Sequence, residues 1–151
     1  MISIQEEAYP DFVAEAKPLF PAHWAELALD KDQVPLDPDY DEYMRRYLAG
    51  MCLIVTARED GLLAGYSVNF VAPGLHYRTC LTLTTDIYWV RPDARGARCG
   101  LEMFDRLHYL AKARGVQRIF AGVKEHFSAG WMFERMGYRK VETYYTLWLG
   151  G

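Results

Sequence analysis

One stretch near the middle of the chain, DIYWVRPDARGARCGL, constrains the fold more than any other. It begins as an apolar strand that reaches Val90, and Pro92 stops that strand. Glycines and arginines then turn the chain into a helix that begins at Leu101. Because the first N–H groups of a helix lack intrahelical partners and its dipole adds positive charge, we expect an anion site suited to pyrophosphate. A turn that binds no phosphate is the alternative from this stretch alone.

Length and composition indicate one globular domain, residues 1–151. The 151 residues are 51% hydrophobic, which suits a full core. Cys52, Cys80 and Cys99 are an odd number without metal-ligand spacing, so we expect reduced thiols, no metal and a cytoplasmic location. The N-terminus lacks the pattern of a signal peptide, and no apolar stretch approaches the roughly 20 residues that span a bilayer. We therefore expect a soluble protein with no membrane partner.

Charge is distributed unevenly along the chain. Eleven acidic residues against two lysines precede Tyr43, whereas fifteen basic residues face nine acidic ones from Tyr43 onward. This asymmetry suits an anionic cofactor held by the basic part and a cationic acceptor drawn to the acidic part, although ordinary solvated surface is the alternative. The basic residues alternate with acids and form no aromatic-rich patch, which disfavours a nucleic-acid partner.

The N-terminal half predicts one strand, three helices and an antiparallel meander. The first strand contains Ile2 and Ile4, which alternate with polar neighbours. Apolar residues at helical spacing predict helices over Ala8–Lys17, Ala22–Leu29 and Tyr40–Leu48. Apolar, β-rich runs predict strands over Cys52–Ala57, Leu62–Val71 and Leu75–Val90. The sequence Arg58-Glu59-Asp60-Gly61 predicts a tight turn between the first two of these strands.

The C-terminal half predicts alternating helices and strands. An apolar stripe continues from Leu101 until Arg114-Gly115 ends the helix. The strand Arg118–Val123 follows a helical crossover, so it should lie parallel to the strand that ends at Val90. Ser128 should cap a short helix ended by Gly137, and one or two strands should cover Tyr138–Leu149.

Two motifs in this order resemble the GNAT superfamily of acetyl-coenzyme A-dependent N-acetyltransferases. Val90-x-Pro92 with Arg95-x-x-x-x-Gly100 resembles its coenzyme signature, Gln/Arg-x-x-Gly-x-Gly/Ala, but Arg98 replaces the first glycine. The second motif, His126-x-x-Ala129-x-x-x-Phe133-x-x-x-Gly137-Tyr138, matches the spacing of Asn-x-x-Ala-x-x-x-Tyr-x-x-x-Gly-Phe, with His126 and Phe133 at its two polar positions. The resemblance covers nearly the whole chain.

The resemblance implies an α/β (α+β) fold. The GNAT fold has a mixed, mostly antiparallel central sheet of six to seven strands flanked by about four to five helices. A parallel pair of strands splays apart after the meander and admits the coenzyme. In this chain the splayed pair would be the strand ending at Val90 and the strand Arg118–Val123.

The resemblance also implies which residues bind acetyl-coenzyme A. The backbone of Tyr88, Trp89 and Val90 would bind pantetheine. The pyrophosphate turn would comprise Arg95, Gly96, Ala97, Arg98, Cys99 and Gly100, followed by Leu101. His126, Ser128 and Phe133 of the second motif would complete the coenzyme site. No metal is implied, and Cys99 would lie too far from the thioester for a covalent intermediate.

Two residues are candidates for acid–base catalysis. Asp86 is the stronger general base because it lies within an otherwise uncharged strand, where its carboxylate would be partly removed from water. A solvated or structurally paired Asp86 is the alternative. His126 is the second candidate, although it occupies a coenzyme-binding position. Since Phe133 has no proton to donate, another group such as His126, Ser128 or a nearby tyrosine would protonate the thiolate, unless the thiolate leaves unprotonated or the enzyme is weak.

The function that follows is transfer of an acetyl group to a primary amine by direct attack in a ternary complex. The acceptor is a small cationic amine or a protein amine, placed between Phe20–Tyr47 and the turn Leu75-His76-Tyr77, where acids and aromatics could hold an ammonium group. The alternatives are a weak or inactive coenzyme A-binding module and a GNAT-like nucleic-acid-modifying protein. The oligomeric state is left open, with a homodimer as one option.

Overall fold

The computed structural model describes residues 1–127 and 129–151. In this part of the chain five strands form one sheet in the order β1-β2-β3-β4-β5: β1 (Ile2–Glu7), β2 (Cys52–Glu59), β3 (Leu62–Gly74), β4 (Tyr77–Val90) and β5 (Arg118–Phe120). The first four pair antiparallel, and β5 lies parallel to β4 as predicted. The mixed, mostly antiparallel α/β fold is confirmed, but the described residues form five strands rather than six or seven.

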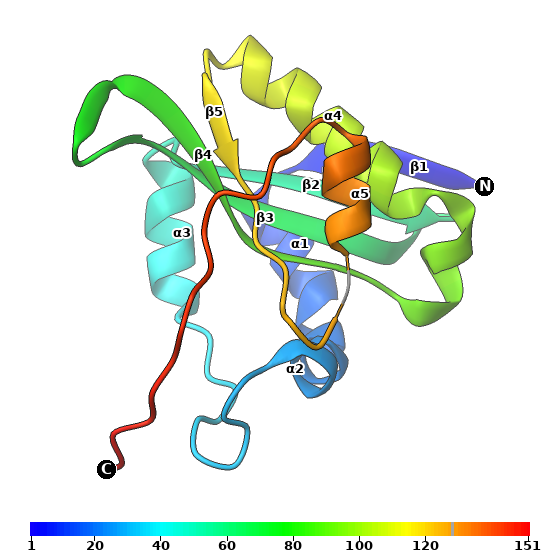
Figure 1. Ribbon diagram of the computed structural model, residues 1–151. Helices are drawn as coiled ribbons and strands as arrows, with labels where there is room; N and C mark the ends of the chain where they lie inside the picture. The colour runs from blue at the N-terminus through cyan, green and yellow to red at the C-terminus, as the bar shows by residue number, and fades with distance from the viewer. Residues whose placement is uncertain (128) are drawn as a thin grey trace.

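Helices cover both faces of this sheet (Figure 1). The helices are α1 (Tyr9–Ala16), α2 (Phe20–Leu27) and α3 (Tyr40–Leu48) on one face, and α4 (Cys99–Ala113) and α5 (Gly130–Arg135) on the other; the 3-10 helix η1 (Lys17–Leu19) joins α1 to α2. Alternate residues of β2 divide between the two cores. Leu53 and Val55 pack toward α4, whereas Cys52 and Ile54 pack toward α1, as the two-residue period of a strand requires.

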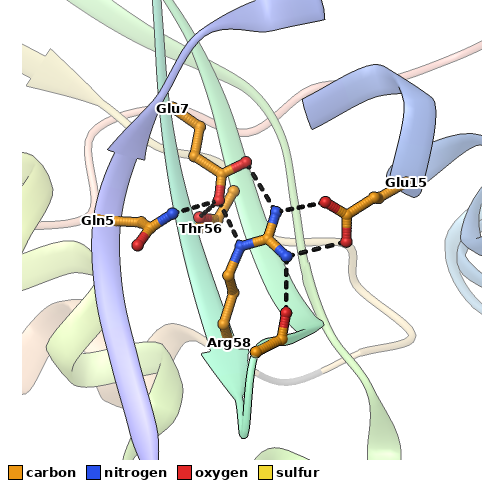
Figure 2. Close-up of polar contacts among 6 residues, drawn as sticks. Gln5, Glu7, Glu15, Thr56 and Arg58 are labelled. Atoms are coloured by element: carbon orange, nitrogen blue, oxygen red, sulfur yellow. Dashed lines mark hydrogen bonds and ion pairs between the residues drawn. The ribbon is translucent and has the colours of Figure 1, made fainter. Parts of the chain in front are cut away.

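A buried ion-pair network joins β1, β2 and α1 (Figure 2). Glu7 accepts hydrogen bonds of 2.6 Å from Arg58 and from the hydroxyl of Thr56. Arg58 also binds Glu15 on α1 at 2.8 Å and donates to the carbonyl of Gly61. Burial by itself would raise the pKa of Glu7, but the hydrogen bonds from Arg58 and Thr56 outweigh it and hold that pKa below its usual value. The network therefore stabilises the fold with Glu7 ionised.

The parallel pair is short and then opens. Thr82, Leu83 and Thr84 of β4 pair with the three residues of β5. Beyond Thr84, β4 continues to Val90 and pairs only with β3, whereas the chain after β5 leaves the sheet. On that side, the backbone N–H and C=O groups of the last part of β4 have no strand partner among the described residues, which is the splayed arrangement that the resemblance implied.

A β-bulge lies within this open part of β4. Ile87 pairs with Val68 on β3. The next pair joins Thr85 to Asn69, so Asp86 has no partner on β3. An extra residue of this kind bends the strand and redirects its side chain. The buried side-chain oxygen of Asn69 accepts a hydrogen bond from the hydroxyl of Thr85 at 2.8 Å, which fixes the position of the bulge.

The prediction of one or two strands over Tyr138–Leu149 is wrong, because this segment is extended without ladder partners. A strand requires a neighbouring edge, and β5, at the edge of the sheet, is only three residues long. The C-terminal end of the segment instead lies away from the body of the protein (Figure 1). Its exposed large apolar side chains are Val141, Tyr144, Tyr145, Leu147, Trp148 and Leu149.

Candidate functional site

The predicted pyrophosphate turn joins β4 to α4 through the 3-10 helix η2 (Pro92–Ala97). Arg98, which stands where the resemblance expects glycine, has a left-handed backbone with φ of 59°. Glycine adopts this conformation freely, whereas other residues do so at a cost of about 1 kcal/mol. The turn thus keeps the backbone shape of a glycine while its exposed arginine side chain points outward. Ser128, from the second motif, lies outside the described residues.

The start of α4 is packed tightly against α5. A Cβ atom at Gly100 would lie 3.2 Å from Sδ of Met132, whereas one at Gly96 would meet nothing within 4 Å. Cys99 is fully buried, and burial raises the pKa of its thiol to about 11. A neutral, buried thiol is a poor nucleophile. Leu101, by contrast, is partly exposed.

Arg95 points toward α2 rather than outward. Its Nε donates to the carbonyl of Val90 at 2.9 Å, and its Nη2 forms an ion pair of 2.5 Å with Glu26. Its guanidinium also lies 5.1 Å from the ring centroid of Phe127. His126 adds a second contact to α2 because its Nε2 lies 3.2 Å from the carbonyl oxygen of Glu26. Arg95 and His126 therefore connect the turn and the segment after β5 to α2.

A cavity of about 1290 Å³ opens beside the splayed end of β4. Its walls come from α1, α2 and the segment after α2, from Thr84–Tyr88 of β4, from the segment after β5, from α5, and from the C-terminal segment. Of the predicted site residues, those that line it are Asp86, Tyr88, His126 and Phe133. Trp89 is buried in the core on the α1 side, and Val90 packs against the core on the α4 side.

Asp86 lies at the bulge, where the cavity meets α3. The hydroxyl of Tyr43 on α3 donates a hydrogen bond to its carboxylate. The expectation that Asp86 is partly removed from water is wrong, because its side chain, at the bulge, is exposed to solvent. Burial, followed by the hydrogen bond to Asp86, raises the pKa of Tyr43 well above its usual range, so the phenol stays protonated. No hydrogen bond or ion pair joins Asp86 to His126, so they form no catalytic pair.

Phe133 lies in an aromatic cluster on the α4 side of the cavity. It is 6% exposed and packs edge-on against Phe104 and Tyr88, at centroid distances of 5.0 and 5.7 Å. The hydroxyl of Tyr88 donates to the carbonyl of Gly122 at 2.9 Å, across the opening between β4 and the segment after β5. Burial raises the pKa of Tyr88 to about 12. A protonated hydroxyl therefore lies in the opening, beside the ring that lacks one.

A second aromatic cluster, which the sequence did not predict, lies on the α2 side. Nδ1 of His23 lies 2.7 Å from the hydroxyl of Tyr66, and the imidazole stacks on Trp89 with centroids 5.8 Å apart. Burial lowers the pKa of His23 to about 4, so the residue is neutral at pH 7. The sequence offered too little to find this cluster, since its three members are far apart in the chain. Tyr43, too, was missed as a partner of Asp86.

Among the described residues, no group of three or more His, Cys, Asp or Glu side chains could hold a metal ion. No helix in the same part of the chain has the length and apolar character needed to cross a membrane.

The order of the elements, the splayed parallel pair and the turn into α4 define the GNAT acetyltransferase fold. Solved structures agree along essentially the whole chain. A ribosomal-protein-alanine N-acetyltransferase from Brucella melitensis biovar Abortus 2308 is 18% identical with a TM-score of 0.74, covering 99% of this chain and 100% of that one. A predicted acetyltransferase from Clostridium acetobutylicum, solved with acetyl-CoA, is 17% identical with a TM-score of 0.70, covering 99% and 97%.

An aminoglycoside acetyltransferase from an uncultured soil metagenomic sample, in complex with sisomicin, is also similar. It is 15% identical with a TM-score of 0.70, and the match covers 97% of this chain and 96% of that one. No family model and no curated protein matches the sequence. At these identities the likeness establishes the shared fold.

Proposed function

We propose that this protein is an acetyl-CoA-dependent N-acetyltransferase that acts on a primary amine. One observation carries the proposal: the unpaired end of β4 lies between the turn into α4 and a large cavity that contains Asp86. A linear thioester coenzyme can bind along such a strand, with its phosphates at the turn and its acyl group in the cavity. The similar structures, which include one with acetyl-CoA and two acetyltransferases of different amines, support this assignment.

The coenzyme would occupy the opening beside β4. Its pantetheine arm would bind the outward-facing backbone groups of Tyr88, Trp89 and Val90, which have no strand partner among the described residues, although the carbonyl of Val90 accepts from Arg95. Its pyrophosphate would bind N–H groups at the start of α4, where Cys99, Gly100 and Leu101 have no earlier helical turn to bind. The other residues proposed to contact it are Arg95, Gly96, Ala97, Arg98, His126, Ser128 and Phe133.

Transfer would proceed by direct attack of the amine on the thioester carbonyl. A C–N bond forms, the carbonyl oxygen becomes an oxyanion that a free N–H of β4 can stabilise, and the C–S bond then breaks. We assign Asp86 to accept the proton from the attacking nitrogen, because it is the carboxylate of β4 that faces the cavity. We assign the Tyr88 hydroxyl to protonate the departing thiolate, because it lies in the opening where Phe133 has no donor.

The test combines coenzyme binding with thiol release. Calorimetry should show that Gly100→Glu greatly weakens coenzyme A binding, because a carboxylate would face the phosphates. Gly100→Gln is the matched control: it adds nearly the same volume beside Met132 without the charge, so it should retain more affinity. Equal affinities of wild type and Gly100→Glu would overturn the proposed coenzyme site.

A coenzyme-binding module without activity is the second candidate, and Phe133 is the observation that favours it. Thiol release from acetyl-CoA with a panel of amines separates the two functions. Tight binding with no release above the uncatalysed rate for any amine would establish the module and refute the enzyme.

A further inference from the structure

The acids predicted to form the acceptor groove mostly face away from the cavity. Among Asp30, Asp32, Asp37, Asp39, Asp41 and Glu42, only Asp37 lines it. Asp39 caps α3 by accepting from the N–H of Glu42, and Glu42 forms ion pairs with Arg45 and Arg46. Asp39 and Glu42 also line a separate, smaller pocket beside Tyr43 and Asp86. Most of the acids expected to hold the ammonium group of the acceptor therefore do not line the large cavity.

The wall that the cavity does have on this side is apolar. Phe20, Trp24 and Leu27 of α2 contribute to it, and three side chains from the segment after α2 extend it: Leu29, Val34 and Leu36. These three are 47%, 43% and 40% exposed, respectively. Apolar side chains that line a cavity yet remain open to water are a binding surface for an apolar ligand group.

The charged groups around the cavity leave little net charge for a ligand. On the side formed by the segment after β5, α5 and the C-terminal segment, three basic residues are balanced by three acidic ones: Lys124, Arg139 and Lys140 against Glu125, Glu134 and Glu142. Asp37 and Asp86 are the remaining carboxylates of the lining. The described lining thus has three basic against five acidic residues, a net charge of minus 2, which complements one or two positive charges far better than three to five.

Asp86 is positioned to receive the positive charge of an ammonium group. It lies on β4 next to the opening, whereas the apolar wall is formed by α2 and by the segment after α2. Glu26, which is close in sequence to the wall, is already paired with Arg95 and is not among the lining residues. His23 is neutral at pH 7, so it does not repel a cation. The cavity thus has a carboxylate at its reactive end and an apolar surface beyond it.

We infer that the acceptor is a monocationic primary amine on an apolar body, with its ammonium group at Asp86 and its aromatic or aliphatic part against Trp24, Leu29 and Leu36. This inference rests on the proposed function and gives its acceptor a chemical class. It separates this protein from the aminoglycoside acetyltransferase of the same fold, whose name describes a polycationic substrate. Apolar contact, rather than summed charge, selects the acceptor.

A series of amines tests the inference. With acetyl-CoA, kcat/KM for butylamine, hexylamine and octylamine should rise with chain length, by about fourfold for each methylene group that the wall buries. Phenylethylamine and tryptamine should exceed spermine and sisomicin by at least about tenfold. Leu36→Ser should lower kcat/KM for hexylamine. Leu62→Ser, which changes a leucine that is 67% exposed on β3 outside the lining, is the control and should not.

Binding measured by calorimetry with coenzyme A present separates this inference from the proposed function. If phenylethylamine binds more tightly than spermine and Leu36→Ser weakens it, the inference holds even where no amine releases thiol, and only the proposed activity fails. Tighter binding or faster turnover of spermine or sisomicin overturns the inference while leaving the acetyltransferase in place. Equal values across the alkylamine series overturn it as well.

Discussion

Tyr43 on α3 donates a hydrogen bond to Asp86, the residue that the bulge of β4 leaves unpaired. The ring of Tyr43 is itself fixed, because it stacks on Tyr9 with centroids 6.1 Å apart and packs against Phe70. A tyrosine held in this way restricts the rotamer of Asp86. Tyr43 is therefore a positioning residue for the proposed base, contributed by a helix remote from it in sequence.

Tyr43→Phe should lower kcat/KM for an amine acceptor by about tenfold to a hundredfold, since a hydrogen bond to a charged group contributes about 1.5–3 kcal/mol. Coenzyme A affinity should not change. Steady-state kinetics with a fixed amine check the first point and calorimetry the second. Tyr47→Phe, on the same helix, is the control because its hydroxyl has no hydrogen-bond partner among the described residues. An equal loss in both variants would assign Tyr43 to packing alone.

Tyr88→Phe should reduce kcat by about a hundredfold, the lower range for loss of a general acid. The aromatic ring is kept, so the edge-on contacts with Phe104 and Phe133 remain. Thermal unfolding of the variant should match the wild type to within a few degrees. His126→Gln serves for comparison. If its kcat falls while that of Tyr88→Phe does not, then His126 rather than Tyr88 protonates the thiolate.

Glu7→Gln should destabilise the fold by about 3 kcal/mol, because it removes the buried one of the two carboxylate partners of the largely buried Arg58. Glu15→Gln removes the more exposed partner of Arg58 and should cost less than about 1 kcal/mol. Urea unfolding at pH 7 measures both differences. Equal losses in free energy of unfolding would show that the buried Arg58–Glu7 pair stabilises the fold no more than the exposed Arg58–Glu15 pair.

The same Glu7→Gln variant has a defined pH dependence. The folded pKa of Glu7 lies below its usual value of 4.5, so its contribution is fully present above about pH 4.5 and is lost as pH falls through the lower, folded pKa. The stability difference between wild type and variant should therefore shrink below about pH 4.5. A constant difference down to pH 2 would contradict this account.

His23 should impose a separate pH dependence at milder acidity. The unfolded chain takes up a proton near the usual pKa of 6.5, but burial lowers the folded pKa to about 4, so folding opposes protonation between these values. As the pH is lowered from 6.5 to about 4, His23 should therefore reduce the free energy of unfolding of the wild type by up to about 3 kcal/mol. His23→Gln should flatten that slope in urea titrations, whereas His76→Gln, at an exposed hairpin residue, should leave it unchanged.

Features that depend on local chemistry were predictable from the sequence. The turn at Asp60-Gly61 requires positive φ at both residues, and they have φ of 49° and 87°. The parallel placement of β5 follows from its helical crossover and is confirmed. The helix over Tyr40–Leu48 has the predicted bounds, and the side chain of Asp39 caps its first turn. In each case a few neighbouring residues decide the outcome.

Features that depend on distant partners were not predictable. The alternation of β4 gives no sign of the bulge, because the irregularity arises from its pairing with Asn69 on β3. The number of acids near α3 favoured an acidic acceptor site. Which of these acids lines the cavity, however, depends on the path of the segment after α2. The extended C-terminal segment has strand composition, yet no sufficiently long edge lies beside it.

The ion pair between Arg95 and Glu26 joins the turn proposed for the coenzyme to the helix proposed for the acceptor. If a bound phosphate draws Arg95 away, Glu26 is released and α2 loses one of its contacts. The two substrates are then thermodynamically linked: the factor by which the coenzyme changes acceptor affinity equals the factor by which the acceptor changes coenzyme affinity. The strength of this coupling thus depends on one salt bridge, the 2.5 Å contact between Arg95 and Glu26.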